Sequence, residues 1–153
     1  STAITDPEKV RDTTVYLGQD ASGGLASVTS TSGWAWKYPG RVGDSPIPGA
    51  GYYADSRYGA CACTHTGEMT MRCMTAHSVV EGLRHGLDLA QAVADAVQDL
   101  RALTTGYLGE VVIHAIDTKG NHRVVTLAGP KPVSYWIWTS AMATPERRLS
   151  DLA

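Results

Sequence analysis

Segment 40–51 restricts the possible fold more than any other part of this chain. Its sequence, GRVGDSPIPGAG, contains four glycines, two prolines and one pair of opposite charges. Glycine carries a large entropic cost in regular structure and proline lacks the backbone N–H, so this composition cannot propagate a helix or a central strand. The sequence therefore predicts an ordered loop that presents backbone groups, the Arg41 guanidinium and the Asp44 carboxylate.

The two charged residues of this loop stand three positions apart, and their spacing allows two interpretations. In the first, Arg41 and Asp44 form a local ion pair on the surface. In the second, they form a clamp for a zwitterion, in which Arg41 binds a carboxylate and Asp44 binds an ammonium group. The residues alone leave both interpretations open.

The bulk composition is that of one soluble domain large enough to bury a core. The chain has 153 residues, of which 43% are hydrophobic and 18% charged, and its formal net charge is −2. This balance gives no reason to expect a nucleic acid or a membrane surface as partner, and no apolar run is long enough to span a bilayer. The sequence does not determine the compartment; a bacterial cytoplasm, a periplasm and a lysosome-like location all remain open.

The three cysteines, Cys61, Cys63 and Cys73, are expected to be free thiols packed in the core. An odd number argues against a disulfide framework, and a zinc site would need a fourth ligand at a suitable spacing, which the sequence does not offer. The histidines show no ligand spacing either. We therefore expect no metal and no cofactor.

Alternating patterns and turn residues predict six strands. They are expected at 13–20, 25–31, 58–64, 108–117, 122–128 and 133–139, followed by a polar tail. The first two and the fourth and fifth should form hairpins. The small side chains of 58–64 indicate a strand that is buried on both faces.

Two helices are expected between the third and fourth strands. Apolar residues recur at helical spacing from Met69 to Leu87, and Gly86 is expected to end this helix. Asp88 can cap the second helix, whose apolar stripe comprises Leu89, Val93, Val97 and Leu100. Strands that flank a helix pair predict an α+β fold, with helices stacked on a largely antiparallel sheet.

Several segments together resemble the N-terminal-nucleophile asparaginases, a family that includes glycosylasparaginase and the isoaspartyl peptidase/L-asparaginases. They are Asp12-Thr13, TSTSG at 29–33, the whole loop 40–51, YAD at 53–55, Thr64 and Gly67-Glu68. The similarity is strong over the first half of the chain and looser over the helices. SPIPG at 45–49 and GEMTMR at 67–72 are more similar to the glycosylasparaginase branch.

The resemblance implies a precursor that cuts itself into α and β chains at the Asp12–Thr13 bond. Residues 1–12 would then be a linker remnant, and residues 13–153 the C-terminal, β-chain half of a four-layer αββα Ntn-hydrolase sandwich. The partners implied are the α chain of the same precursor, a second αβ unit in an (αβ)2 assembly, and a small amino-acid amide as substrate.

The resemblance also assigns catalytic roles. Thr13 would be the nucleophile, with its own α-amine as the base once the bond before it is cut. Asp12 would assist that self-cleavage, and Thr31 would hydrogen-bond and tune the nucleophile. Without the resemblance, Thr13 and Thr31 are ordinary β-branched residues of strands.

The oxyanion hole would be formed by the Thr64 hydroxyl and the backbone N–H of His65, and the substrate clamp by Arg41 and Asp44. The chain departs from the family pattern at several positions. Arg11 stands where histidine is common, Thr14 where an aliphatic residue is common, and Val15 and His65 where glycine is usual. The His65 side chain would crowd the site or reshape substrate choice, and an alternative is that it acts as a general base.

The function that the resemblance implies is hydrolysis of the side-chain amide of asparagine derivatives. N4-(β-N-acetylglucosaminyl)-L-asparagine is the first substrate, and L-asparagine or an isoaspartyl dipeptide is the alternative. An uncut or inactive homologue that only binds its ligand is a further alternative. Trp34 or Trp36 could stack on a sugar, although packing in the core or against the α chain is the simpler role.

Overall fold

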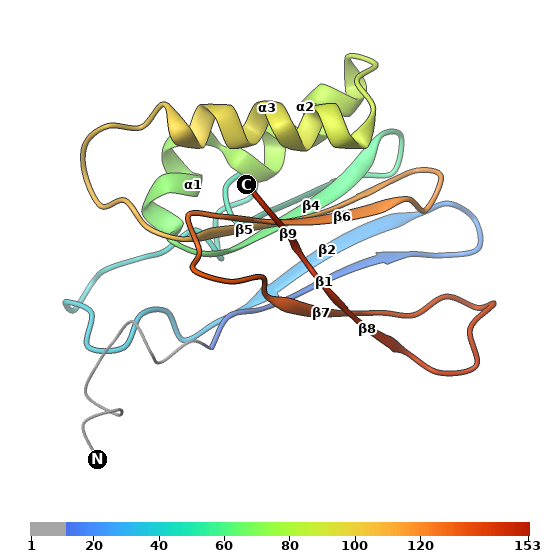
Figure 1. Ribbon diagram of the computed structural model, residues 1–153, viewed down its shortest axis with the longest axis horizontal. Helices are drawn as coiled ribbons and strands as arrows, with labels where there is room; N and C mark the ends of the chain where they lie inside the picture. Colours follow the sequence, from blue (N-terminus) through green and yellow to red (C-terminus); the bar gives the residue numbers. More distant parts are fainter. Residues whose placement is uncertain (1–11) are drawn as a thin grey trace.

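The computed structural model describes residues 12–153, in which three helices cover one face of a central sheet (Figure 1). Segment 1–11, most of the predicted linker, lies outside the described residues. The central sheet has the strand order β3-β4-β5-β6-β9. Its strands are β3 (Tyr52–Asp55), β4 (Gly59–His65), β5 (Val111–Asp117), β6 (His122–Leu127) and β9 (Asp151–Leu152). All neighbours are antiparallel except β6 and β9.

Two short ribbons lie along the face of this sheet that the helices leave open (Figure 1). The first pairs β1 (Thr14–Gln19) with β2 (Leu25–Ser30), and the second pairs β7 (Ser134–Ile137) with β8 (Glu146–Leu149). Hydrogen bonds tie the first ribbon to the molecule: Ser27 donates to the carbonyl of Cys61 at 3.0 Å, and Thr29 to that of Ser45 at 2.7 Å. The predicted α+β class is confirmed.

Strand β4 is buried on both faces, as its small residues predicted. Ala60, Cys61, Ala62 and Cys63 have no exposed surface. A Cβ added to Gly59 would lie 2.4 Å from Leu83 Cδ1, so helix α2 approaches this strand more closely than a larger residue would allow. The three cysteines are free thiols, as expected, with Cys73 half-buried beside the core.

The helix predicted from Met69 to Leu87 is two helices, α1 (Gly67–Cys73) and α2 (Thr75–Arg84). Met74 separates them in the left-handed region, with φ of +47°, and its N–H still donates to the carbonyl of Thr70. Both helices bury their apolar residues, and these residues keep the same spacing across Met74. The spacing therefore cannot reveal the break. Gly86, with φ of +88°, follows α2 where a helix end was predicted.

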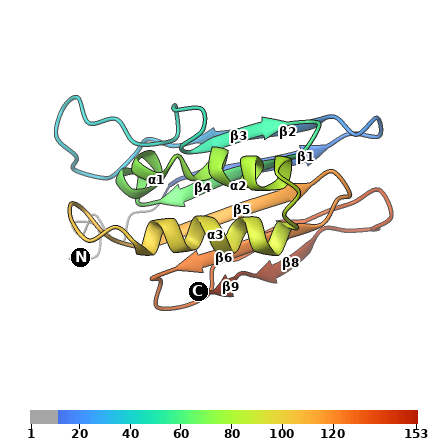
Figure 2. The ribbon, with the colours of Figure 1, turned by 90° about the horizontal axis from the view of Figure 1, so that it is seen from above.

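Helix α3 (Leu89–Arg101) confirms the second predicted helix. Its stripe of Leu89, Val93, Val97 and Leu100 is buried, and α3 runs beside α2 over the sheet (Figure 2). Asp88 caps it through a reciprocal pair of bonds. The Asp88 carboxylate accepts from the N–H of Gln91 at 2.8 Å, and the Gln91 side chain accepts from the N–H of Asp88 at 3.2 Å.

We expect Asp88→Ala to lower the free energy of unfolding by about 1 kcal/mol, because the N–H of Gln91 loses its acceptor. Urea denaturation followed by circular dichroism measures the difference. Asp95→Ala is the matched control, since Asp95 is exposed in the middle of the same helix. Equal effects of the two substitutions would contradict a capping role for Asp88.

The sequence missed three strands. The polar tail expected after residue 139 contains β8 and β9, and β3 was not predicted beside loop 40–51. Strand β8 (ERRL) is exposed along its whole length, and it pairs with β7 through its backbone and a bond from Arg147 to Ser134, so it carries no hydrophobic signal. Strand β9 is fixed by a buried polar contact next to it, where Ser150 bonds Thr126 at 2.7 Å.

Candidate active site

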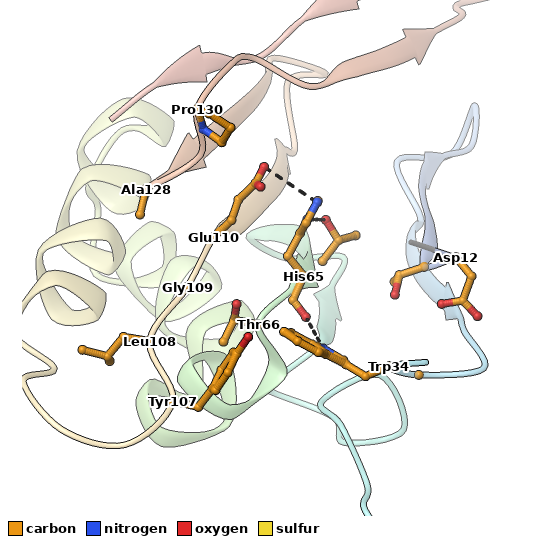
Figure 3. A pocket seen from close by; sticks show the side chains of 13 residues that line it. Asp12, Trp34, His65, Thr66, Tyr107, Leu108, Gly109, Glu110, Ala128 and Pro130 are labelled. Carbon is orange, nitrogen blue, oxygen red and sulfur yellow. Dashed lines mark hydrogen bonds and ion pairs between the residues drawn. The ribbon is translucent and has the colours of Figure 1, made fainter. Parts of the chain in front are cut away.

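One pocket of about 410 Å³ gathers most of the residues that the resemblance singled out (Figure 3). Its walls come from the residues before β1, the loop after β2, the end of β4, the segment before β5 and the loop after β6. Asp12, Thr13, Thr64 and His65 all line it. The pair Asp12-Thr13 and the pair Thr64-His65 lie far apart in the sequence, and packing of the β1–β2 ribbon against β4 brings them together.

The β1–β2 ribbon places Thr13 next to Thr31. Thr14 pairs with Ser30, so the residues one step further along each strand face each other. Their hydroxyl oxygens are 3.0 Å apart. Sequence spacing alone could not determine this pairing, but the antiparallel register does.

The hydroxyl of Thr31 has three partners and only one proton. It donates to Asp12 Oδ1 at 3.1 Å and accepts from the N–H of Gly33 at 2.8 Å. In the third contact, with Thr13, it must therefore accept. The Thr13 hydroxyl thus directs its proton toward Thr31.

Asp12 is held by residues that follow β2. Its carboxylate accepts from the N–H of Ser32 at 2.8 Å, from the Ser32 hydroxyl and from Thr31. Partial burial alone would raise the pKa of Asp12, but the hydrogen bonds from Ser32 and Thr31 outweigh it and lower the pKa below the ordinary value. The residue before the candidate nucleophile is therefore an ionised, fixed carboxylate at neutral pH.

Thr64 and His65 end strand β4 at the opposite wall of the pocket. Thr64 is buried, and its hydroxyl lies 2.9 Å from Nδ1 of His65. His65 has φ of +82°, in the left-handed region where glycine is favoured and other residues are strained by about 1–3 kcal/mol. This backbone conformation explains why a glycine would suit the position, and why a histidine there needs partners for its ring.

Those partners are present on two sides. The Nε2 atom of His65 faces Glu110 Oε1 at 3.7 Å, an ion-pair distance, and the carbonyl of His65 accepts from the indole N–H of Trp34 at 3.4 Å. Trp34 in turn meets the edge of Tyr107, with ring centroids 5.0 Å apart and planes at 88°. Trp34 therefore forms an aromatic wall of the pocket, whereas Trp36 is 73% exposed.

Arg41 does not pair with Asp44, so the simple ion-pair interpretation of the loop is wrong. Its guanidinium binds Glu68 of helix α1, with Nε and Nη2 at 2.8 and 2.6 Å from Glu68 Oε1. The same guanidinium lies 6.0 Å from the ring of Trp34. Arg41 thus stands behind the aromatic wall and is not one of the residues that line the pocket.

Asp44 is one of the few buried charged residues among those described, with 5% of its surface exposed. The hydroxyl of Thr70 in α1 donates to Asp44 Oδ2 at 2.6 Å. A Cβ on Gly67 would lie 2.8 Å from both the N and Oδ1 atoms of Asp44, so the helix can begin there only with glycine. Burial raises the pKa of Asp44 above its ordinary value, against the lowering effects of Thr70 and of Arg41.

We expect Asp44→Asn to stabilise the fold at neutral pH while it weakens binding of any ligand ammonium group. The pKa of Asp44 is higher in the folded than in the unfolded chain, so its ionisation costs stability. The gain from asparagine should be absent in acid, grow as pH rises through the pKa of Asp44, and then stay constant. Urea denaturation of both forms from acid to neutral pH measures it; a constant difference across that range would contradict this account.

Two acidic residues of this region were missed from the sequence. Glu68 is named only within a segment that carries the resemblance, without a role, and Glu110 precedes β5 with no pattern to mark it. Both become visible only as partners of Arg41 and His65 in three dimensions. Within residues 12–153, no group of three or more His, Cys, Asp or Glu side chains could hold a metal ion, and no helix could cross a membrane.

Comparison with known proteins gives consistent results. Residues 2–137 match a family model described as asparaginase. The chain is 37% identical over 146 residues to an isoaspartyl peptidase of Salmonella typhimurium. These residues are 95% of this chain and 45% of that protein. The isoaspartyl peptidase of Escherichia coli K12 is also 37% identical over 146 residues, covering 95% of this chain and 44% of that protein.

A second group of relatives is named for a different activity. The N(4)-(beta-N-acetylglucosaminyl)-L-asparaginase of Rattus norvegicus is 42% identical over 91 residues, which are 60% of this chain and 26% of that protein. The chain thus spans less than half the length of each of these curated relatives.

Proposed function

This chain belongs to the asparaginase family, and on that premise we propose that it supplies the nucleophile of a hydrolase acting on the side-chain amide of asparagine derivatives. The observation that carries the proposal is the contact between the Thr13 and Thr31 hydroxyls, beside Asp12 and across one pocket from Thr64. A candidate nucleophile and a candidate oxyanion donor thereby line one cavity, and Thr31 bonds the nucleophile from beside it.

In the proposed mechanism, the Thr13 hydroxyl first attacks the carbonyl of Asp12, which converts the peptide bond into an ester and frees the Thr13 amine. Water then hydrolyses this ester and leaves Asp12 with a free carboxylate. The new α-amine of Thr13 has an ordinary pKa of about 7.7–8.0 and can accept the hydroxyl proton. Thr13 then attacks the substrate amide, and the Thr64 hydroxyl with the N–H of His65 stabilises the oxyanion. The same amine returns its proton to the leaving amine. Water then hydrolyses the ester between Thr13 and the aspartyl group, which releases aspartate and restores the Thr13 hydroxyl.

The clamp formed by Arg41 and Asp44 would bind the α-carboxylate and α-ammonium end of the substrate. Arg41 binds the α-carboxylate and Asp44 the α-ammonium, which orients the side-chain amide toward Thr13. In the free chain Glu68 occupies two nitrogens of Arg41. Substrate carboxylate must therefore use the remaining face of the guanidinium or displace Glu68.

The first substrate that we propose is N4-(β-N-acetylglucosaminyl)-L-asparagine. The aromatic wall of Trp34 and Tyr107 supports it, because a sugar ring packs well on aromatic faces. An isoaspartyl dipeptide or L-asparagine is the second candidate. The Salmonella isoaspartyl peptidase favours it, since that similarity covers 95% of this chain.

The proposal includes the assembly. Residues 13–153 would form the β-chain half of a four-layer αββα sandwich, completed by an α chain from the same precursor, in an (αβ)2 unit. The face of β1–β2 that points away from the sheet carries two exposed apolar side chains, Tyr16 and Val28, which supports a further layer there.

Two measurements test the function. Intact-mass spectrometry after incubation should reveal a fragment that begins at Thr13. A side-by-side assay of glycosylasparagine, asparagine and a β-aspartyl dipeptide should then identify the substrate by release of aspartate. Persistent linkage of Asp12 to Thr13, together with ligand binding but no release of aspartate from any of the three, would instead support an uncut binding protein.

A further inference from the structure

Glu110 and His65 face each other in one wall of the pocket (Figure 3), and Thr64 lies on the other side of the His65 ring. The carboxylate of Glu110 faces Nε2 of His65 at 3.7 Å, and Nδ1 on the other side of the ring lies 2.9 Å from the Thr64 hydroxyl. The imidazole therefore stands between a carboxylate and the hydroxyl proposed to stabilise the oxyanion.

The backbone builds this arrangement from two neighbouring strands. His65 ends β4 opposite Val111, the first residue of β5, so Glu110 lies beside the strand end. The carbonyl of Glu110 accepts from the N–H of Thr66 at 3.0 Å. A Cβ on Gly129 would lie 2.8 Å from Glu110 Oε1, so the glycine leaves room for the carboxylate. Glu110 and His65 are 10% and 17% exposed, which makes the pair well shielded from water.

The position of the carboxylate bears on which ring nitrogen carries the proton in neutral His65. A carboxylate facing Nε2 favours a proton there, so Nδ1 of neutral His65 is an acceptor. The Thr64 hydroxyl must then donate to Nδ1, and only its lone pairs face the pocket. When His65 is charged, Nδ1–H donates to Thr64 instead, and the Thr64 proton is free to turn toward a ligand.

We propose that Glu110 and His65 are positioning residues that switch Thr64 between an acceptor and a donor, so that the oxyanion site works only while His65 is charged. This inference rests on the proposed function, and it adds a role for the His65 side chain and for Glu110. When His65 is charged, the Thr64 hydroxyl can donate its hydrogen bond to the oxyanion. When His65 is neutral, the Thr64 hydroxyl donates to Nδ1 of His65 instead.

The titratable groups around His65 are mostly acidic. Within the described residues, Glu110 faces the ring directly, and the Asp12 carboxylate and the Tyr107 phenol line the same pocket. His114 of β5 also faces this region. Burial, with the charge of His65, lowers the pKa of His114 to about 4, so it is neutral near pH 7 and does not repel a charged His65.

Two groups of the site therefore have opposite pH requirements. The α-amine of Thr13 must be neutral to accept a proton, so turnover should rise with pH through its titration. His65 must be charged, so turnover should fall with pH through its own titration. The product is a bell-shaped profile of kcat/KM in which the alkaline limb belongs to His65.

The first test is nuclear magnetic resonance of the His65 ring nitrogens in the intact protein, which needs no catalysis. Neutral His65 should carry its proton on Nε2, and Glu110→Gln should move the titration midpoint to lower pH. Glu146→Gln makes the same change at an exposed residue of β8 outside the pocket and should leave the midpoint in place. A proton on Nδ1 of the neutral ring, or an unmoved midpoint in Glu110→Gln, would overturn the proposal.

The second test is the pH profile of turnover. Glu110→Gln should move the alkaline limb of kcat/KM to lower pH together with the His65 midpoint, and His65→Gly should remove that limb. A limb that stays in place while the His65 midpoint moves would also overturn the proposal. If no substrate is turned over at any pH, the proposed function fails, and the ring-nitrogen measurement still decides the arrangement of protons.

Discussion

Replacement of Thr13 by alanine is expected to leave the Asp12–Thr13 bond intact and to reduce turnover on the order of 10⁶-fold, as loss of a hydrolase nucleophile does elsewhere. The substitution removes the only hydroxyl that both proposed reactions use, the attack on Asp12 and the attack on substrate. Intact mass and release of aspartate measure the two reactions separately. Binding of aspartate through Arg41 and Asp44 should remain.

The matched control is the neighbouring residue. Thr14 is exposed on the other side of strand β1, so Thr14→Ala should leave cleavage and turnover close to those of the unaltered protein. Thr13→Ser keeps a hydroxyl at the same place and should retain both reactions at reduced rates. If Thr13→Ala turns over within tenfold of the parent, the nucleophile lies elsewhere.

Replacement of Gly51 by alanine is expected to destabilise the fold by about 3 kcal/mol, the upper part of the range for overpacking. A Cβ at this position would lie 2.4 Å from the carbonyl oxygen of Asp44 and 2.9 Å from the Cα of Ser45. These are backbone atoms, which cannot turn aside. The carbonyl of Gly51 also accepts from Cys63 at 2.8 Å, so the segment cannot move away without loss of a bond to β4.

Urea denaturation of Gly51→Ala against Gly18→Ala isolates the steric effect. Neither glycine has a left-handed backbone, and a Cβ on Gly18 would meet nothing within 4 Å, so Gly18→Ala should be neutral or slightly stabilising. The displaced loop should also disturb Asp44 and weaken aspartate binding in Gly51→Ala. Equal stability of the two variants would mean that loop 40–51 is more yielding than its contacts indicate.

The sequence predicted the parts of this fold that depend on local pattern. The stripe of helix α3, the cap at Asp88 and the small residues of β4 each leave a mark within a few positions, and each is confirmed. The elements it missed have no such mark. Met74 leaves the helical conformation without interrupting the apolar spacing, and β8 pairs with β7 without burying any side chain.

The candidate site also has a part that the sequence indicates and a part that only the three-dimensional structure reveals. The resemblance named Thr13, Thr31 and Thr64, but the contact of Thr13 with Thr31 follows from strand register. Glu68 and Glu110 were missed because an acidic residue becomes informative only when its partner is known. The resemblance placed Arg41 and Asp44 in one clamp, whereas the structure gives each a different partner, Glu68 and Thr70.

The three contacts of the Thr31 hydroxyl have a consequence for the order of events. While Asp12 is in place, Thr31 donates its single hydroxyl proton in a hydrogen bond to the Asp12 carboxylate, so Thr13 must be the donor in its contact with Thr31. In the proposed mature form, Asp12 ends another chain and is free to leave. After Asp12 leaves, the Thr31 hydroxyl can donate to Thr13 instead and stabilise negative charge on the nucleophile. One cut would thus produce a base at once and, when Asp12 leaves, a proton donor beside it.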